Sequence, residues 1–210
     1  MKKLLVIGAL LCVLCSCGSG NGRAKKVLTG THESQAWVDL GLPSGLKWAT
    51  CNVGASAPGE YGNYYAWGET VTRTNYASDC CASFCKPWGT IGGDFAHDAA
   101  RANWGGRWRM PTKEEFQELV DNCTWDRTTQ DGNEGYKVTG PNGQSFFLPA
   151  TGFRYEETLF VSGDGGSYWS STPFESSDRN SYGLYFHKVN ISVDYDGRYV
   201  GRSVRPVLED

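Results

Sequence analysis

The clearest pattern of hydrophobic and polar positions lies near the C-terminus of the chain, where apolar residues recur at every second position. Residues 184–186 and 189–194 alternate in this way. A period of two is typical of a strand that buries one face in a core. Because the apolar residues Phe186 and Val189 are an odd number of positions apart, we expect a bulge or a tight turn between the two strands.

Two more hairpins are predicted upstream of these strands. Residues 37–42 and 46–49 are short apolar-rich segments, and a Pro-Ser-Gly turn separates them. Residues 135–139 and 145–149 flank Asn142-Gly143. An Asn-Gly pair between two apolar runs is a strong signal for a hairpin turn. The chain therefore has a pronounced β character outside its middle section.

The middle section predicts two helices. Residues 94–104 are rich in alanine and end at a Gly-Gly pair, which indicates a helix and its stop. Residues 112–120 predict a second helix, in which Thr112 caps the first turn and Glu115 reaches back to close a capping box. Apolar side chains at spacings of three and four then bury one face of this helix.

Glycines and aromatic residues indicate a fold that is rich in loops. The chain contains 27 Gly, 8 Trp, 11 Tyr and 9 Phe. No period holds from residue 52 to residue 93, so we expect loops with brief strands there. Asp196-Gly197 predicts a turn, and residues 199–207 the last strand. This composition suits long loops that present a wet, aromatic binding face.

The start of the chain has the three parts of an export signal. A basic Lys2-Lys3 pair precedes an apolar run over residues 4–14, and small residues then lead to a cysteine. Leu14-Cys15-Ser16-Cys17 resembles a lipobox, so residues 1–16 are predicted to be a lipoprotein signal peptide and Cys17 the lipid-bearing residue. We expect a flexible tether over residues 17–35 and one domain over residues 36–210.

Charge argues against nucleic acid as a partner. The net charge is −3, and removal of Lys2 and Lys3 with the signal makes it −5. No basic stripe or arginine cluster remains that could neutralise phosphates.

Cysteine usage agrees with an exported protein, in which disulfides persist. The mature chain has five cysteines besides Cys17, an odd number. We expect one disulfide between Cys51 and Cys123 and another from Cys85 to Cys80 or Cys81. A zinc or redox site in the Cys80-Cys81…Cys85 segment is the alternative, but it lacks the C-x-x-C spacing and a neighbouring histidine.

Five motifs carry a resemblance to a known family. The motifs lie at residues 37–48, 103–112, 148–154, 168–172 and 201–207. In this order they resemble the Fibrobacter succinogenes major paralogous domain, which is abundant in Bacteroidetes lipoproteins. That family is related to the formylglycine-generating (sulfatase-modifying factor) group and to the C-type lectin fold. The resemblance implies an α+β, C-type-lectin-like domain with small antiparallel sheets, two helices, long loops, and first and last strands side by side.

The resemblance also suggests enzymatic and calcium-dependent alternatives, which the residues do not support. Formylglycine-generating enzymes use a pair of copper-binding cysteines near the C-terminus, whereas the last cysteine here is Cys123. His32, His97 and His187 are too scattered for a zinc motif. The sugar-binding signatures of calcium-dependent lectins are absent. We therefore expect a protein that is not an enzyme and that holds no metal or cofactor.

A binding module remains, and the C-terminal strands are its expected surface. Aromatic anchors and adaptable polar groups alternate there with apolar residues that are kept for packing. We expect an outer-membrane lipoprotein, on the periplasmic or the cell-surface side, that recognises a glycan or a protein at the cell envelope. The predicted ligand-binding residues are Phe174, Arg179, Asn180, Tyr185, His187, Asn190, Asp194, Tyr195, Arg198 and Tyr199.

An alternative function follows from a second resemblance. Tyr168-Trp169-Ser170-Ser171-Thr172, followed later by Gly201-x-Ser-Val-Arg, is similar to the variable region of proteins that retroelements diversify at asparagine codons. Glu175 and Lys188 are not reachable from such codons, and Pro206 stands where these proteins often have Cys. The reachable positions are Asn180, Tyr185, His187, Asn190, Asp194, Tyr195 and Tyr199.

Overall fold

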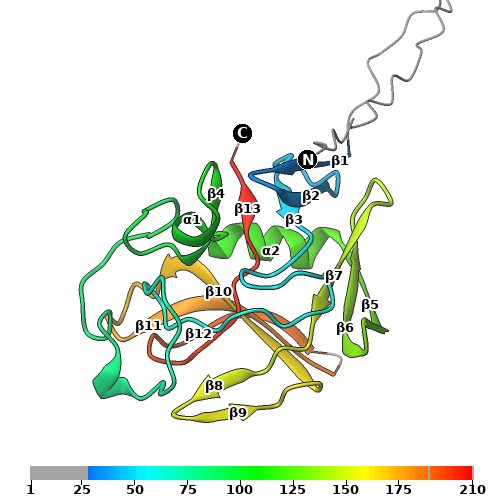
Figure 1. Cartoon of the computed structure of the whole chain (residues 1–210). Helices are drawn as coiled ribbons and strands as arrows, with labels where there is room; N and C mark the ends of the chain where they lie inside the picture. The colour runs from blue at the N-terminus through cyan, green and yellow to red at the C-terminus, as the bar shows by residue number, and fades with distance from the viewer. Residues whose placement is uncertain (1–27, 189, 210) are drawn as a thin grey trace, which may run out of the picture.

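A computed structural model describes residues 28–188 and 190–209 of the chain (Figure 1). The predicted signal peptide, the lipid-bearing Cys17 and the tether up to residue 27 lie outside these residues. The described part consists mainly of small antiparallel sheets, with two α-helices and long connecting loops. The α+β class, the small sheets and the pair of helices agree with the expectation from sequence.

The two ends of the described chain meet in a five-stranded sheet. The first predicted hairpin is confirmed, because the second and third strands of the chain pair antiparallel. The last strand lies between the third and the fourth and pairs with both, at the top of Figure 1. In the order of the sheet, the strands are β1 (Thr29–His32), β2 (Gln35–Asp39), β3 (Lys47–Ala49), β13 (Val207–Leu208) and β4 (Trp108–Arg109).

Strand β1 was not predicted, and it lies in the segment expected to be tether. It pairs with β2 through a two-residue turn, in which Glu33 and Ser34 have φ values of 47° and 63°. Positive φ at both central positions is the geometry of a tight hairpin turn, but glycine or asparagine normally supplies it. Ordered structure therefore begins before residue 36.

The second predicted helix is confirmed together with its cap. Helix α2 spans Lys113–Asn122, and the Thr112 side chain accepts a hydrogen bond from the Glu115 backbone N–H at 3.2 Å. The Glu115 carboxylate accepts the Thr112 N–H at 2.8 Å and is also held by the Arg109 guanidinium at 2.6 Å. The capping box thus fixes the start of α2 and ties it to β4.

The first predicted helix is shorter than expected. Helix α1 spans only Ala99–Trp104, because Asp98 acts as its N-cap and accepts the backbone N–H groups of Ala100 and Arg101. The other oxygen of the same buried carboxylate accepts N–H groups from Gly93 and Met110. Residues 94–97 are consequently held in turns before the helix begins.

The main core lies around α2, which Figure 1 places between the five-stranded sheet and the strands below it. Phe116 and Leu119 of α2 are fully buried, and the Phe116 ring lies 5.6 Å from that of Trp48 in β3. Leu184 and Phe186, which the sequence pattern assigned to packing, belong to the same cluster. The apolar residues of the predicted alternation therefore lie on the side of the C-terminal strands that faces α2.

The second predicted hairpin is confirmed, and an unpredicted strand extends it. Strands β6 (Asn133–Thr139) and β7 (Ser145–Pro149) pair around the Asn142-Gly143 turn. Strand β5 (Thr124–Gln130) pairs with β6 along its whole length. Most residues of β5 are exposed, so it carries no apolar alternation that a sequence pattern could reveal.

The C-terminal strands form a three-stranded sheet beside a small hairpin. Strands β11 (Asn180–His187) and β12 (Asn190–Gly197) are the predicted alternating pair, and a tight turn joins them, because His187 pairs with Asn190. Strand β10 (Gly165–Pro173) pairs with the other side of β11. Strands β8 (Phe153–Tyr155) and β9 (Thr158–Phe160) form the hairpin at the bottom of Figure 1.

Two predictions about the C-terminus are wrong. Asp196-Gly197 ends β12 rather than forming the turn, which falls on the two residues after it. The predicted strand 199–207 is not continuous, because its backbone bridges in turn to Arg154, Tyr65 and Tyr168 before β13 begins. The segment contacts several parts of the fold in turn, so it pairs with no single strand along its length.

Long loops carry most of residues 50–98, with one 3₁₀ turn at Ser78–Cys80. Cys51, Cys81, Cys85 and Cys123 are free thiols, so the predicted disulfides of Cys51 with Cys123 and of Cys85 with Cys80 or Cys81 are wrong. Cys81 Sγ lies 3.2 Å from the Ser83 hydroxyl, and Cys123 packs against the main core.

Candidate functional site

The β10–β11–β12 sheet has one face in the core and one face toward a pocket. Leu184 and Phe186 turn toward α2, so the residues between them turn the opposite way. Ser167, Tyr185 and Ser192 lie side by side across the three strands on this second face. The hairpin β8–β9 and the chain segment around Arg202 lie near it, as Arg154 bridges to Gly201.

A cavity of about 410 Å³ opens on this second face, which we call the Arg202 pocket. Its size suits a small ligand or one residue of a larger one. The walls are mainly apolar and aromatic, while polar side chains from all three strands reach it. Its lining consists of Phe153, Val161, Gly165, Gly166, Ser167, Tyr185, Phe186, His187, Asn190, Ser192, Asp196 and Arg202.

Arg202 is the most unusual residue of the pocket. Its side chain is 1% exposed, and its guanidinium carbon lies 4.4 Å from the Trp169 ring and 4.2 Å from the Tyr185 ring. Its Nη2 forms an ion pair with the Asp196 carboxylate, which is 48% exposed. Burial lowers the pKa of Arg202 well below its usual value, because it disfavours the charged form.

Several buried polar atoms gather here without a hydrogen-bond partner among the described residues. They are Nε and Nη1 of Arg202, the Tyr185 hydroxyl and the Ser167 hydroxyl. A buried donor or acceptor that stays unpaired costs on the order of 1–3 kcal/mol. Such groups are rare in folded proteins, and together on one cavity they indicate a place where a ligand supplies the missing partners.

Three of the ten predicted ligand-binding residues line the Arg202 pocket. Tyr185, His187 and Asn190 come together there because β11 and β12 pair in the register that sets His187 opposite Asn190. Asp194 is exposed on the same face but does not line the cavity. The three residues therefore share one location, and their contact with a ligand stays a prediction.

Four predicted residues lie away from the pocket. Phe174 and Tyr195 stack with their ring centres 3.8 Å apart, on the α2 side of the sheet. Arg179 is exposed and covers the Phe84 ring at 5.7 Å. Asn180 is half-buried, and its carbonyl accepts a hydrogen bond from Arg198. The alternation of the strands places these side chains on the other face or beyond its edge.

Arg198 and Tyr199 were predicted to bind a ligand, but they pack inside the protein. Arg198 is fully buried and donates to Ser181 Oγ at 2.9 Å and to the Lys86 carbonyl at 2.6 Å. Tyr199 is half-buried, and its ring meets that of Phe84 edge-on at 5.4 Å. The chain turns inward after β12, so both side chains join loops to the core.

Arg205 has a structural role similar to that of Arg198. It is fully buried and donates to Asn52 Oδ1 at 2.8 Å and to the carbonyls of Ala49 and Phe147 at 3.0 Å. Arg205 therefore joins β3, β7 and the first long loop. Arg205 has no unpartnered nitrogen and Arg198 has one, Nη2, whereas Arg202 has two in the described chain and also lines a cavity.

Sequence reasoning missed Ser167, Ser192, Asp196 and Arg202 of this site. The sequence places Asp196 in a predicted turn and Arg202 within one of the family motifs. The spacing of Ser192 from Asn190 could have identified Ser192, because residues two positions apart lie on the same face of a strand. Arg202 had no such signal, since it reaches the pocket from an irregular segment.

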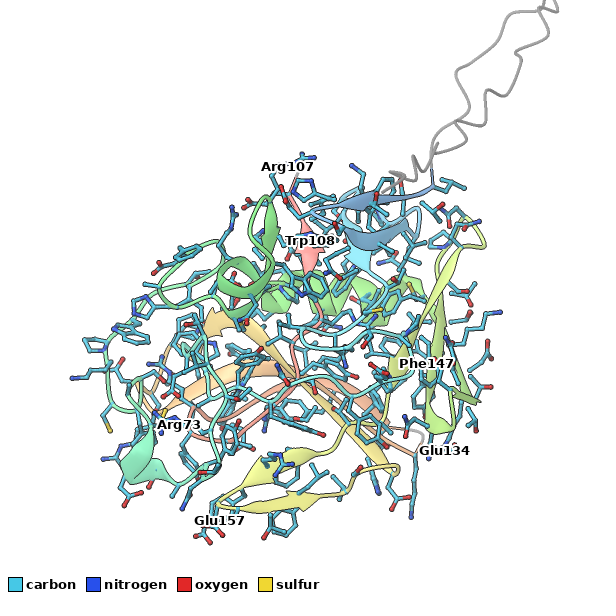
Figure 2. All side chains as sticks on the ribbon, in the orientation of Figure 1. Arg73, Arg107, Trp108, Glu134, Phe147 and Glu157 are labelled. Atoms are coloured by element: carbon cyan, nitrogen blue, oxygen red, sulfur yellow. The ribbon has the colours of Figure 1, made fainter. Side chains whose placement is uncertain are left out.

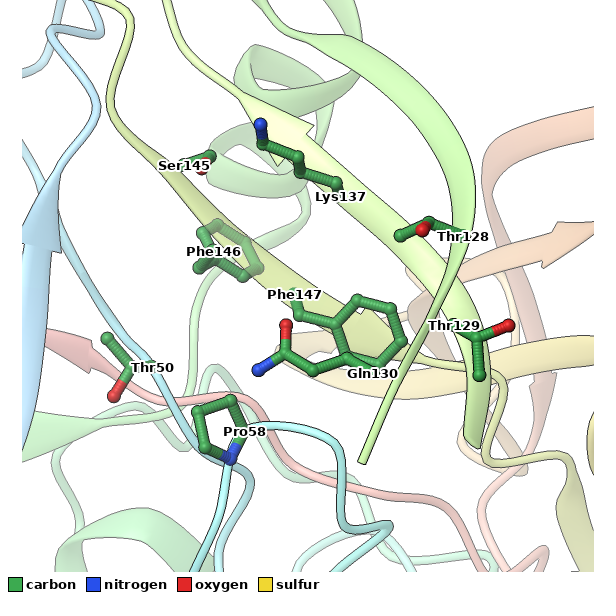
Figure 3. Close-up of a pocket in the computed structure, with 9 residues that line it drawn as sticks. All are labelled: Thr50, Pro58, Thr128, Thr129, Gln130, Lys137, Ser145, Phe146 and Phe147. Carbon is green, nitrogen blue, oxygen red and sulfur yellow. The ribbon is translucent and has the colours of Figure 1, made fainter. Parts of the chain in front are cut away.

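A second cavity, of about 360 Å³, lies on the outer face of the β5–β6–β7 sheet. Figure 3 shows Phe147 and Gln130 close together in it, with Pro58 of the long loop below them. None of the unpartnered buried atoms of the described residues belongs to this cavity. In Figure 2, Phe147 and Glu134 lie on the right of the molecule, apart from Glu157 at the turn of the β8–β9 hairpin. We therefore take the Arg202 pocket as the candidate site.

Two further findings concern metals and membranes. Within residues 28–188 and 190–209, no three His, Cys, Asp or Glu side chains come together as a metal site would require. Neither helix of this part of the chain is long and apolar enough to cross a bilayer.

Comparison with known proteins identifies the family. No curated protein and no solved structure matched the chain. A family model described as the Lcl C-terminal domain matches residues 41–208, which include the helices, the pocket and the strands β3 to β13. This match is consistent with the paralogous lipoprotein domain that the motifs resemble. The match covers well over half of the 210 residues, and the chain therefore belongs to the Lcl C-terminal domain family.

Proposed function

We propose that this chain is a non-catalytic lipoprotein of the outer membrane that binds a glycan or a protein ligand through the Arg202 pocket. Lipidation at Cys17 anchors it at the cell envelope. One observation carries the proposal: an almost fully buried arginine, two hydroxyls without hydrogen-bond partners among the described residues, and three residues of the predicted binding face share one cavity.

The energetics of the cavity support a ligand. Arg202 and Asp196 form an ion pair in which the arginine is almost fully removed from water. Removing a charge from water is costly unless the remaining hydrogen bonds are satisfied, and two Arg202 nitrogens lack partners in the described chain. A structural arginine is expected to look like Arg205, which donates to three acceptors. An arrangement left incomplete at a cavity is typical of a binding site.

The finer fold assignment is part of the same proposal. We infer a C-type-lectin-like domain, related to the formylglycine-generating group, from the motifs and from the way in which β13 lies beside β3. The oxidase activity of that group does not follow, because the sequence has no cysteine after Cys123. The site instead resembles a recognition site, with aromatic walls and few polar groups.

A fixed binding site fits the chain better than a diversified one. Of the positions that asparagine-codon mutagenesis could rewrite, Tyr185, His187 and Asn190 line the pocket. Tyr195 lies on the opposite side of the sheet, and Tyr199 packs on Phe84. The reachable positions therefore do not share one surface.

The test uses the full chain in detergent. Arrays of glycans and envelope proteins identify a ligand, and calorimetry then compares the unchanged chain with Tyr185→Ala/His187→Ala/Asn190→Ala. We expect the affinity to fall by more than about tenfold, because truncating aromatic anchors costs about 2 kcal/mol or more at an interface. Glu114→Ala/Gln117→Ala, on the exposed face of α2, is the matched control and should bind normally. Equal binding by the pocket variant, or loss in the control alone, would contradict the proposal.

A further inference from the structure

The hydrogen-bonding groups of the Arg202 pocket are mainly donors. Arginine can only donate, and its Nε and Nη1 lack acceptors among the described residues. The hydroxyls of Tyr185 and Ser167 each have a proton to donate and are also unpartnered in this part of the chain. The group that completes the site therefore has to offer acceptor oxygens.

The position of these donors restricts how a ligand approaches. The guanidinium of Arg202 lies over the rings of Trp169 and Tyr185, at 4.4 and 4.2 Å. Stacking occupies the faces of a guanidinium and leaves its N–H groups, which lie in its plane, at the edge. One edge contacts Asp196. A small, flat acceptor fits the remaining edge better than a bulky one.

The charge of the pocket favours a neutral acceptor. Asp196 already balances the positive charge of Arg202 through their ion pair. A ligand carboxylate on the same guanidinium would lie near Asp196, and two like charges at close range repel each other. A carbonyl oxygen accepts the same N–H groups without that repulsion.

The walls favour a methyl group beside that carbonyl. Phe153 and Val161 supply apolar surface around the cavity, while Asn190 and Ser192 supply polar groups on the β12 side. A methyl group is stabilised by the apolar side chains, and ring hydroxyls pair with the amide and hydroxyl of the strand.

We propose that the Arg202 pocket binds the acetamido group of an N-acetylated amino sugar. The acetamido carbonyl accepts from the edge of Arg202 and from the Tyr185 hydroxyl, and its methyl group contacts Phe153 and Val161. The sugar ring lies toward Asn190 and Ser192. This inference rests on the proposed function and names the class of ligand for that site.

The test compares matched sugars by calorimetry with the full chain in detergent. The probes are di-N-acetylchitobiose, cellobiose and a glucuronic-acid disaccharide, which differ in the acetamido group or the carboxylate. We expect the acetylated sugar to bind at least about tenfold more tightly than the other two, which is the effect of a hydrogen bond to a charged donor. Equal or tighter binding of cellobiose or the glucuronic-acid sugar overturns the inference.

Two variants add a readout on the protein side. Tyr185→Phe removes one donor and keeps the ring over Arg202, so binding of the acetylated sugar should weaken several-fold while cellobiose is unaffected. Ser167→Ala should act in the same direction. A loss of the same size for every sugar contradicts an acetamido contact. If a ligand from the arrays depends on the pocket but shows no acetamido preference, this inference fails and the proposed function stands. If no ligand depends on the pocket, both fail.

Discussion

The guanidinium carbon of Arg198 lies 4.3 Å from the centre of the Trp67 ring, and both side chains are fully buried. The same guanidinium donates to Ser181 in β11 and to the Lys86 carbonyl in a long loop. A single side chain thereby connects the β10–β11–β12 sheet to the loops that cover it. Arg198 therefore stabilises the fold, whereas the sequence predicts that it contacts a ligand.

We predict that Arg198→Ala lowers the free energy of unfolding by about 2–4 kcal/mol. The substitution leaves buried acceptors unpaired and removes the packing against Trp67. Urea denaturation followed by tryptophan fluorescence measures the change. Arg179→Ala is the control, because Arg179 is exposed and should cost within about 0.5 kcal/mol. A loss below about 1 kcal/mol for Arg198→Ala would show that the buried contacts contribute little.

The stability of the domain should fall at alkaline pH. Burial raises the pKa of Tyr168 to about 12 and that of the Cys123 thiol to about 11. In an unfolded chain, tyrosine ionises near pH ~10 and cysteine near pH ~8.5. The unfolded state therefore loses these protons first, and the free energy of unfolding decreases as the pH rises from about 9 to about 12.

Tyr168 alone accounts for about 3 kcal/mol of this decrease, since each unit of pKa shift corresponds to about 1.4 kcal/mol. Urea titrations across the alkaline range measure it, and the absorbance of tyrosinate locates the ionisation. Tyr168→Phe should start less stable, because it loses the hydrogen bond to the Pro149 carbonyl, but its stability should depend less on pH. An unchanged slope in this variant would assign the effect to other groups.

Membrane attachment should depend on one cysteine. The lipobox predicts a thioether-linked lipid on Cys17, so Cys17→Ala should release the protein from membranes or leave it as uncleaved precursor. Cys15→Ala is the matched control and should behave like the unchanged chain. Palmitate labelling followed by membrane fractionation measures both. Labelling that survives in Cys17→Ala would assign the lipid to another residue.

Sequence patterns predicted the parts of the fold that depend on near neighbours. The capping box of Thr112 and Glu115 involves residues three positions apart, and it is present as expected. The hairpin at Asn142-Gly143 depends on two turn residues and is also present. Strand β5 was not predicted, because its side chains are mostly exposed and its sequence therefore has no alternation of apolar and polar residues.

The candidate site was only partly predictable because it depends on distant contacts. Alternation identified Tyr185 as a residue turned away from the core, and the pairing of β11 with β12 then brought it near Ser192. Residue type does not reveal burial, so the sequence predicts a ligand-binding role for Arg198, whereas its side chain is fully buried. Arg202 reaches the pocket through an irregular segment with no period at all.

Strand β13 has a consequence for how the protein is made. It is the last strand of the described residues, yet it lies inside the five-stranded sheet, with β3 on one side and β4 on the other. Until residues 207–208 have been synthesised, β3 and β4 have no partner between them. Pairings between residues so distant in the chain form slowly. The β2–β3 hairpin therefore keeps an open edge until residues 207–208 are available, and their pairing with β3 and β4 completes the sheet.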